Sequence, residues 1–226
     1  MPPVFWTGKL SLRMKWLENI NCLLAWMTGN VRDTVAMKKR IKLGYEGACS
    51  NHVTRYDELG LEQYTKIATL LLEGADLRGK EVLDVGCGTG ILSLLALKQG
   101  AAKLTCGDLS EYMLGQCRKK ISAQGFTEER VDFRQLDAES LTDDGKSFDA
   151  VISGMLIGLV PNQGKVVAEM ARVLRPKGIL AISTHGPDYF WETSDATFRA
   201  IPKRYVIGYR IEYWPRKEEE IRYARL

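Results

Sequence analysis

The sequence predicts an α/β fold in which helices cover both faces of a doubly wound, mostly parallel sheet. From residue 80 onward, short apolar runs rich in β-branched residues alternate with helical patterns, which is the order that parallel βαβ units require. A length of 226 residues suits one such domain with a small appendage. An apolar share of 45% and a charged share of 27% are those of an ordinary globular protein.

Each element of this fold follows from a local pattern. The apolar runs predict strands at 81–85, 103–107, 131–135, 148–153 and 179–184. Helical spacing predicts helices at 91–99, 111–123 and 163–174, with turns at Gly125, Gly145 and residues 176–178. Ligands of such sheets bind beyond the carboxyl ends of the strands, so the site is expected in the loops that follow Val85, Gly107, Gln135 and Ser153.

The predicted organisation is an N-terminal helical appendage at 1–45 and one domain at 46–226. Within that domain we predict a lid at 46–79, a core at 80–185 and a C-terminal extension at 186–226. The segment 10–27 is interpreted as an amphipathic helix because its apolar residues recur at helical spacing. Its charged residues, among them Arg13, Lys15 and Glu18, exclude a membrane span or a signal-peptide core. Packing against the domain or a second copy is favoured over a membrane surface.

The cysteines indicate the compartment of the protein, and the distribution of charge indicates its possible partners. The five cysteines are scattered without any C-x-x-C spacing, which favours reduced thiols in a cytoplasmic protein. The C-terminal segment 199–226 is basic and carries interleaved aromatic residues, which would suit a nucleic acid. Three glutamates at 218–220 interrupt that basic stripe, so nucleic acid is the less favoured partner.

The loop after the first strand carries the strongest chemical signal. Gly86, Gly88 and Gly90 stand at alternate positions between a strand and a helix, where the backbone must turn tightly or let a ligand approach. The dinucleotide fingerprint would need a glycine at position 91, which is isoleucine, and no phosphate-binding P-loop motif is present. Asp84 at the strand end suits the ammonium group of a zwitterionic ligand and disfavours a pyrophosphate.

The segment 81–90 resembles motif I of the class I, Rossmann-like methyltransferases. That resemblance implies S-adenosyl-L-methionine as cofactor and S-adenosyl-L-homocysteine as product, with Asp84 holding the amino group. Asp108, at the end of the second strand, would hold the ribose hydroxyls, and Asp137 would face the adenine amine. The further cofactor contacts that the resemblance implies are Gly86, Cys87, Gly88, Gly90, Leu109, Ala138, Ser153 and, closing from the lid, Tyr56.

The resemblance extends over about residues 60–185. The run Phe148-Asp149-Ala150-Val151 and the segment 172–178 match further family signatures, and the nearest relatives are small-molecule methyltransferases of the ubiquinone and menaquinone type. Two features depart from them. Residues 154–159 are almost wholly apolar where those relatives often carry a histidine. The chain also ends after a predicted helix at 217–225, so we expect a truncated or five-stranded sheet with an open edge.

These patterns predict methyl transfer from S-adenosylmethionine to an oxygen, carbon or nitrogen of a small molecule by in-line displacement, without a metal ion. His185, which follows the last strand, is the candidate general base; capping a turn is an equal alternative. RNA or protein methylation and a non-catalytic cofactor-binding module remain open as alternatives. The N-terminal helix and the open sheet edge are candidate surfaces for a homodimer.

Overall fold

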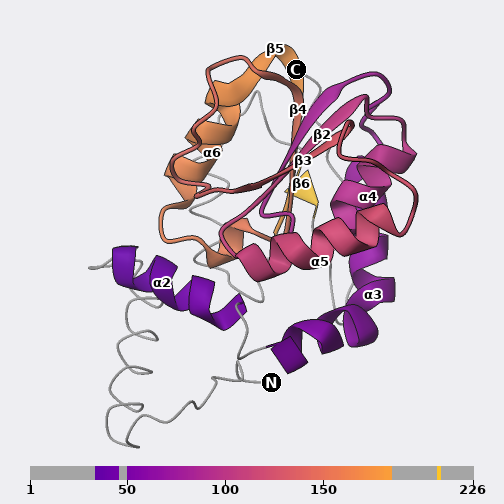
Figure 1. Cartoon of the computed structure of the whole chain (residues 1–226). Helices are drawn as coiled ribbons and strands as arrows, with labels where there is room; N and C mark the ends of the chain where they lie inside the picture. The colour runs from indigo at the N-terminus through magenta and orange to yellow at the C-terminus, as the bar shows by residue number, and fades with distance from the viewer. Residues whose placement is uncertain (1–33, 46–49, 185–207, 210–226) are drawn as a thin grey trace, which may run out of the picture.

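The computed structural model describes residues 34–45, 50–184 and 208–209. The elements in these ranges alternate as the sequence predicts (Figure 1). In chain order they are α2 (Thr34–Tyr45), α3 (Ser50–Leu72), β1 (Glu81–Val85), α4 (Ile91–Lys98), β2 (Lys103–Asp108), α5 (Glu111–Ser122), β3 (Val131–Gln135), β4 (Phe148–Gly154), the 3-10 helix η2 (Ile157–Leu159), α6 (Gln163–Val173), β5 (Leu174–Ser183) and β6 (Gly208–Tyr209).

A parallel sheet with the order β3-β2-β1-β4-β5-β6 organises the molecule. Every pairing within it is parallel, so the carboxyl ends of all strands meet at one edge. The direction of winding reverses between β1 and β4, which lie side by side at the centre of the sheet. That reversal opens a crevice at the carboxyl edge, the usual ligand position in such folds.

Helices cover both faces of the sheet, which confirms the predicted fold class (Figure 1). On one face α3, α4 and α5 pack on a buried cluster that includes Val82 of β1. On the other face α6 and the loop after β3 pack on a second cluster that includes Leu83. Neighbouring residues of the central strand thus face opposite sides, and both are buried, as expected for a strand covered by two helical layers.

The strand β5 departs from the predicted boundaries. It begins at Leu174 and not at residue 179, because Leu174 already pairs with Phe148. The register then shifts, so that Ile179 pairs with Ala150 and the residues between them loop out of the ladder. Lys177 has a φ of 64° in this loop. The predicted turn at 176–178 is therefore an irregularity within a longer strand.

The edge of the sheet beyond β5 is occupied by β6. This two-residue strand pairs in parallel through Gly208 and Tyr209 with Ile182 and Ser183. The predicted five parallel strands are confirmed, and β6 adds a sixth. The helices predicted at 10–27 and 217–225 lie outside the described residues.

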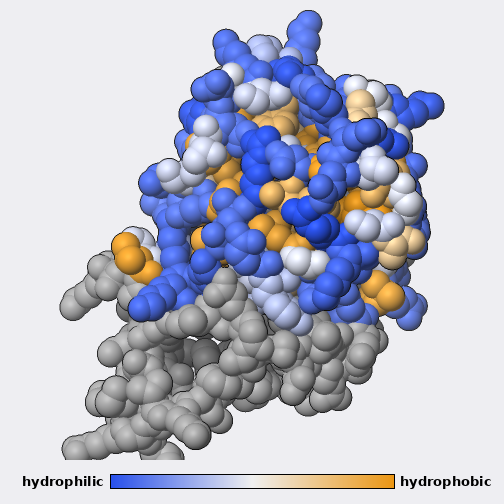
Figure 2. All heavy atoms as spheres, viewed as in Figure 1, coloured by the Kyte–Doolittle hydropathy of each residue, from blue (hydrophilic) through white to orange (hydrophobic). Residues whose placement is uncertain are grey.

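The helix α3 joins the predicted lid to the core. Its second half buries Ala68, Leu71 and Leu72 against the face that carries α4. On the face of the molecule seen in Figure 2, hydrophilic side chains cover most of the described surface, with apolar residues showing between them. None of the described helices has the length and apolar character that crossing a membrane requires.

The second core cluster should dominate the stability of the fold. Leu180 on β5 is 2% exposed and packs among the residues of α6, so Leu180→Ala should lower the free energy of unfolding by about 2–5 kcal/mol. Leu61, which is 48% exposed on α3, is the matched control. Leu61→Ala should change the free energy of unfolding by less than about 0.5 kcal/mol. Denaturant unfolding of both variants measures the difference, and equal losses would contradict this description of the core.

Candidate functional site

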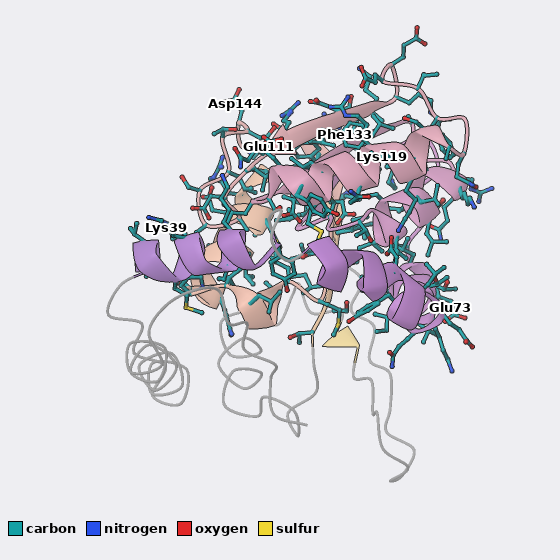
Figure 3. The ribbon with its side chains drawn as sticks, turned by 60° about the horizontal axis from the view of Figure 1, so that its bottom comes forward. Lys39, Glu73, Glu111, Lys119, Phe133 and Asp144 are labelled. Carbon is teal, nitrogen blue, oxygen red and sulfur yellow. The ribbon has the colours of Figure 1, made fainter. Side chains whose placement is uncertain are left out.

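A cavity lies at the carboxyl edge of the sheet, where the crevice between β1 and β4 opens. Its walls come from the loops after β1, β2, β3 and β4, and from the helices α2 and α3. In Figure 3, α2, marked by Lys39, and α3 lie on the same side of the molecule, below α5. The cavity therefore combines parts of the chain that are far apart in sequence.

Most of the predicted cofactor residues line this cavity. The structure brings together Asp84, Gly86, Cys87, Gly88, Asp108, Leu109, Asp137 and Ala138. Gly90 and Ser153 are not in the cavity wall. Ser153 is fully buried, and its hydroxyl donates a hydrogen bond to the carbonyl oxygen of Val85, 2.7 Å away. The side chain of Tyr56 and all of His185 lie outside the part of the chain that the structure describes.

Asp84 ends the central strand as a fully buried carboxyl group at the cavity. The Ser93 hydroxyl donates to its Oδ2 at 2.5 Å, whereas its Oδ1 is buried without a hydrogen-bond partner. Burial raises the pKa of Asp84 well above its ordinary value, since a charged carboxylate loses its hydration there. An unpaired buried carboxyl oxygen is unfavourable unless a ligand supplies a donor or a positive charge.

The glycine loop that follows uses its three glycines differently. A Cβ on Gly86 would lie 2.8 Å from Leu156 Cδ1, and one on Gly90 would lie 2.6 Å from the sulfur of Cys117. These two positions are therefore closed by packing. Gly88 has a φ of 54°, and a Cβ there would meet nothing within 4 Å. At Gly88 the backbone itself is open to a ligand in the cavity.

Asp108 connects the second strand to this loop. Its Oδ2 accepts a hydrogen bond from the Gly88 amide and its Oδ1 accepts one from the Ser110 amide, both at 2.9 Å. Burial raises the pKa of this carboxyl group also, although the two amide donors oppose the rise. Each oxygen keeps a second acceptor site, so Asp108 can hold the loop and still accept hydrogen bonds from a ligand.

A second set of polar contacts, made by Asp57 of α3, holds the same loop in place. The Thr89 hydroxyl donates to Asp57 Oδ1 at 2.8 Å. Lys120 of α5 forms an ion pair with Asp57 Oδ2 at 2.8 Å and donates to Thr89 at 3.2 Å. The position of the glycine loop is therefore coupled to two helices as well as to β2.

The third loop carries an ion pair that the sequence did not predict. Lys38 of α2 contacts Asp137 at 2.6 Å and Glu139 at 2.9 Å. The Asp137 carboxylate also accepts a hydrogen bond from the Glu139 amide at 2.9 Å. Lys38 and Asp137 are 99 residues apart, and no local pattern links positions so distant.

The remaining walls of the cavity are apolar or aromatic. They come from α2, α3 and the segment after β4, and include Ile41, Tyr45, Tyr64, Ile67, Met155, Leu156, Leu159, Val160 and Pro161. Met155 has a φ of 60°, a strained value for a side chain of its size. Its amide donates to the Ser183 carbonyl at 3.0 Å, which ties this wall to β5. This apolar stretch follows Ser153, where the sequence predicted part of the site, and its place in the cavity wall agrees with that prediction.

The cavity thus has a charged half and an apolar half. Four carboxyl groups, Asp84, Asp108, Asp137 and Glu139, face one ammonium group, that of Lys38. Such a surface suits a ligand with one cationic end and several hydrogen-bond donors. No group of three or more His, Cys, Asp or Glu residues in the described ranges could hold a metal ion.

Comparisons with known proteins show similarity to methyltransferases. The family described as a methyltransferase domain matches residues 82–178. A phosphatidylethanolamine N-methyltransferase of Cereibacter sphaeroides is 39% identical over 108 residues, which are 48% of this chain and 52% of that protein. A ubiquinone biosynthesis O-methyltransferase of Dechloromonas aromatica is 37% identical over 113 residues, 50% of this chain and 47% of that protein. The chain spans about half the length of these relatives.

A solved structure shows the same fold. It is a protein of Methanococcus maripaludis described as a candidate S-adenosylmethionine-dependent methyltransferase. The two chains superpose with a TM-score of 0.54 at 20% identity, over 66% of this chain and 69% of that chain. At that identity the likeness concerns the arrangement of helices and strands.

The raised pKa of Asp84 predicts how ligand binding depends on pH. The neutral acid persists to a higher pH than usual, whereas an ammonium group is attracted only by the ionised form. Affinity for S-adenosylhomocysteine should therefore rise with pH above the range in which an ordinary aspartate ionises and then level off, and binding should release a proton over that rise. Calorimetry in two buffers of different ionisation enthalpy measures both effects. Asp84→Asn should bind weakly at every pH, and a flat profile for the wild type would contradict the assignment.

Gly88 and Gly125 form a matched pair for testing the glycine loop. Both have positive φ values, 54° and 81°, and open space where a Cβ would stand, but only Gly88 lines the cavity. An alanine at either position should lower the free energy of unfolding by about 1–2 kcal/mol, the penalty of a left-handed backbone. Only Gly88→Ala should also weaken S-adenosylhomocysteine, by at least about tenfold. Titration calorimetry with unfolding curves separates the effects, and unchanged affinity would show that the loop does not contact the ligand.

Proposed function

We infer that this chain, which carries a methyltransferase domain of the class I, Rossmann-like family, transfers a methyl group from S-adenosylmethionine to a small molecule. The proposal rests on the presence of both Asp84 and Gly88 in the wall of one cavity. A buried carboxyl oxygen of Asp84 without a hydrogen-bond partner and a Gly88 position with open space for a Cβ belong to the same cavity wall. The first suits the ammonium group of the cofactor, and the second allows its methionine part to approach closely.

The rest of the charged half fits the same molecule. Asp108 retains acceptor capacity for two ribose hydroxyls, and charge-assisted hydrogen bonds of this kind are stronger than neutral ones. Asp137 in the third loop can accept a hydrogen bond from the adenine amine, with Leu109 and Ala138 in the walls beside it. These residues have the chemistry that each part of the cofactor requires.

The protein's own contribution to the reaction is positioning. When bound, S-adenosylmethionine supplies a methyl group activated by its sulfonium charge, which an acceptor takes by in-line displacement. The chain has to hold the acceptor at attack distance and exclude water. The apolar walls from α2, α3 and the segment after β4 suit both tasks. Within the described walls after β4 no side chain is titratable, so a proton from the acceptor would leave through another group.

His185 is our candidate for that group. β5 ends at Ser183, which lines the cavity, and His185 follows two residues later in the sequence. An imidazole at this edge of the sheet could accept a proton near neutral pH. Acceptors that lose no proton on methylation would not need it.

A small molecule is the acceptor that the cavity supports best. The apolar walls belong to the same cavity as the predicted cofactor residues, and a small acceptor can pack against them there. The two relatives above are named for methyl transfer to nitrogen and to oxygen, and both kinds of acceptor fit this proposal. We expect an oxygen, nitrogen or carbon nucleophile.

Binding and turnover test the proposal separately. S-adenosylhomocysteine should bind with a Kd in the micromolar range, about −8 kcal/mol, and NAD should not bind. Thermal shift and calorimetry measure this on the whole chain. Incubation with methyl-labelled S-adenosylmethionine and a small-metabolite extract should then transfer label to an extract component, with Asp84→Asn as the inactive control. Tight NAD binding without any response to S-adenosylhomocysteine would overturn the cofactor assignment.

A further inference from the structure

Lys38 stands where a helix outside the sheet meets the polar end of the cavity. Its ammonium group lies 2.6 Å from Asp137 Oδ2 and 2.9 Å from Glu139 Oε2. All three residues line the cavity. The Lys38 side chain is 23% exposed, so the pair is neither a free surface contact nor a fully buried one. One cation therefore bridges two carboxylates directly at a ligand site.

The bridge fixes the direction of Asp137. Its Oδ1 accepts a hydrogen bond from the Glu139 amide and its Oδ2 accepts one from the Lys38 ammonium group, so both oxygens are held in place. Each oxygen keeps a second acceptor position. Burial alone would lower the pKa of Lys38, but hydrogen bonds and charges from the two carboxylates outweigh it and raise that pKa. Lys38 is thus held as a cation beside Asp137.

An ionised carboxylate is an acceptor only, and this has a consequence for ligand choice. It can accept a hydrogen bond from an amino group but meets a carbonyl oxygen with repulsion. The direction in which the Asp137 oxygens point therefore decides whether an amino group at this end of the cavity finds an acceptor.

We propose that Lys38 is a positioning residue that makes the cavity select a purine with an amino group at position 6 over one with an oxo group. The inference rests on the proposed function, since it assumes that the adenine of the cofactor reaches Asp137. It goes beyond that function by assigning ligand selection to a residue of α2, outside the βα loops that form the cofactor site.

The other contacts of Glu139 explain why two carboxylates share one cation. Its Oε1 accepts the amide of Asn162 at 2.9 Å, and Asn162 caps the N-terminus of α6. Glu139 is therefore held from the side of α6, with only 6% of its side chain exposed. Glu139 is therefore a second, fixed partner for the Lys38 ammonium group, and it helps to hold that group beside Asp137.

The test uses two variants of Lys38 and a matched control on the same helix. Lys38→Met removes the charge and keeps the length of the side chain, and Lys38→Arg keeps the charge. Lys39→Met removes the same charge from the next position, where the side chain is exposed (Figure 3). The probes are S-adenosylhomocysteine and its 6-oxo counterpart, S-inosylhomocysteine. Calorimetry gives the ratio of their dissociation constants for each protein, and a melting curve checks that each variant folds.

We expect wild type and Lys39→Met to prefer the 6-amino probe by about tenfold or more, the effect of one charge-assisted hydrogen bond. Lys38→Met should lose most of this preference, since repulsion between the carboxylates of Asp137 and Glu139 would turn Asp137 away from the purine. Lys38→Arg should restore it. A residue that merely supports the fold would weaken both probes equally and leave the ratio unchanged.

Asp137→Ala separates the possible failures. If wild type binds neither probe, the cofactor assignment fails and this inference fails with it. If wild type prefers the 6-amino probe and Asp137→Ala keeps that preference, Asp137 does not contact the purine and the inference is overturned. If Asp137→Ala loses the preference and Lys38→Met keeps it, the proposed function stands and the role of Lys38 is overturned. Loss in both variants, with rescue by arginine, supports the proposal.

Discussion

A carboxyl group that is fully buried with one oxygen unpaired is costly, and this fold places one at the end of its central strand. Asp84 occupies that position because β1 pairs in parallel with β2 on one side and β4 on the other, so that both faces and both edges of the strand are covered. Water cannot hydrate the group there. Asp84 lines the cavity, and the arrangement becomes favourable when a cationic ligand there supplies a partner for Oδ1. The surrounding contacts either support this carboxyl group or shape the space in front of it.

The loops around Asp84 are held by acceptors that serve more than one purpose. Asp108 receives the amide of Gly88 from the neighbouring loop and the amide of Ser110 from the start of α5. A Cβ on Gly107, at the end of the same strand, would overlap the side chain of Leu136. Close packing at the strand ends and backbone hydrogen bonds thus fix the loops before any ligand binds. A site organised in this way needs little rearrangement on binding.

The sequence predicted those parts of the structure whose cause is local. The strands and the glycine loop were found from local apolar runs and glycine spacing, and Asp84 from its place at the end of such a run. Asp108 and Asp137 were found because the family resemblance implied a carboxylate in each of those loops. The start of β5 at Leu174 was missed, since it depends on a shifted register with Phe148 that no local pattern shows. Lys38 and Glu139 were missed for the same reason, because their pairing joins α2 to a loop about a hundred residues later. The roles of the site residues remain predictions.

The division of the cavity into two halves bears on how such a protein changes over evolutionary time. The four carboxyl groups of the charged half come from residues between 84 and 139 and its ammonium group from α2, whereas the apolar half comes from α2, α3 and the segment after β4. Substitutions at Ile41 or Leu159 can reshape the apolar half without removing a hydrogen-bonding side chain of the charged half. Under the proposed function, such substitutions would change the acceptor and leave the cofactor contacts in place. Proteins with this arrangement could therefore come to methylate different acceptors through substitutions in the apolar half of the cavity alone.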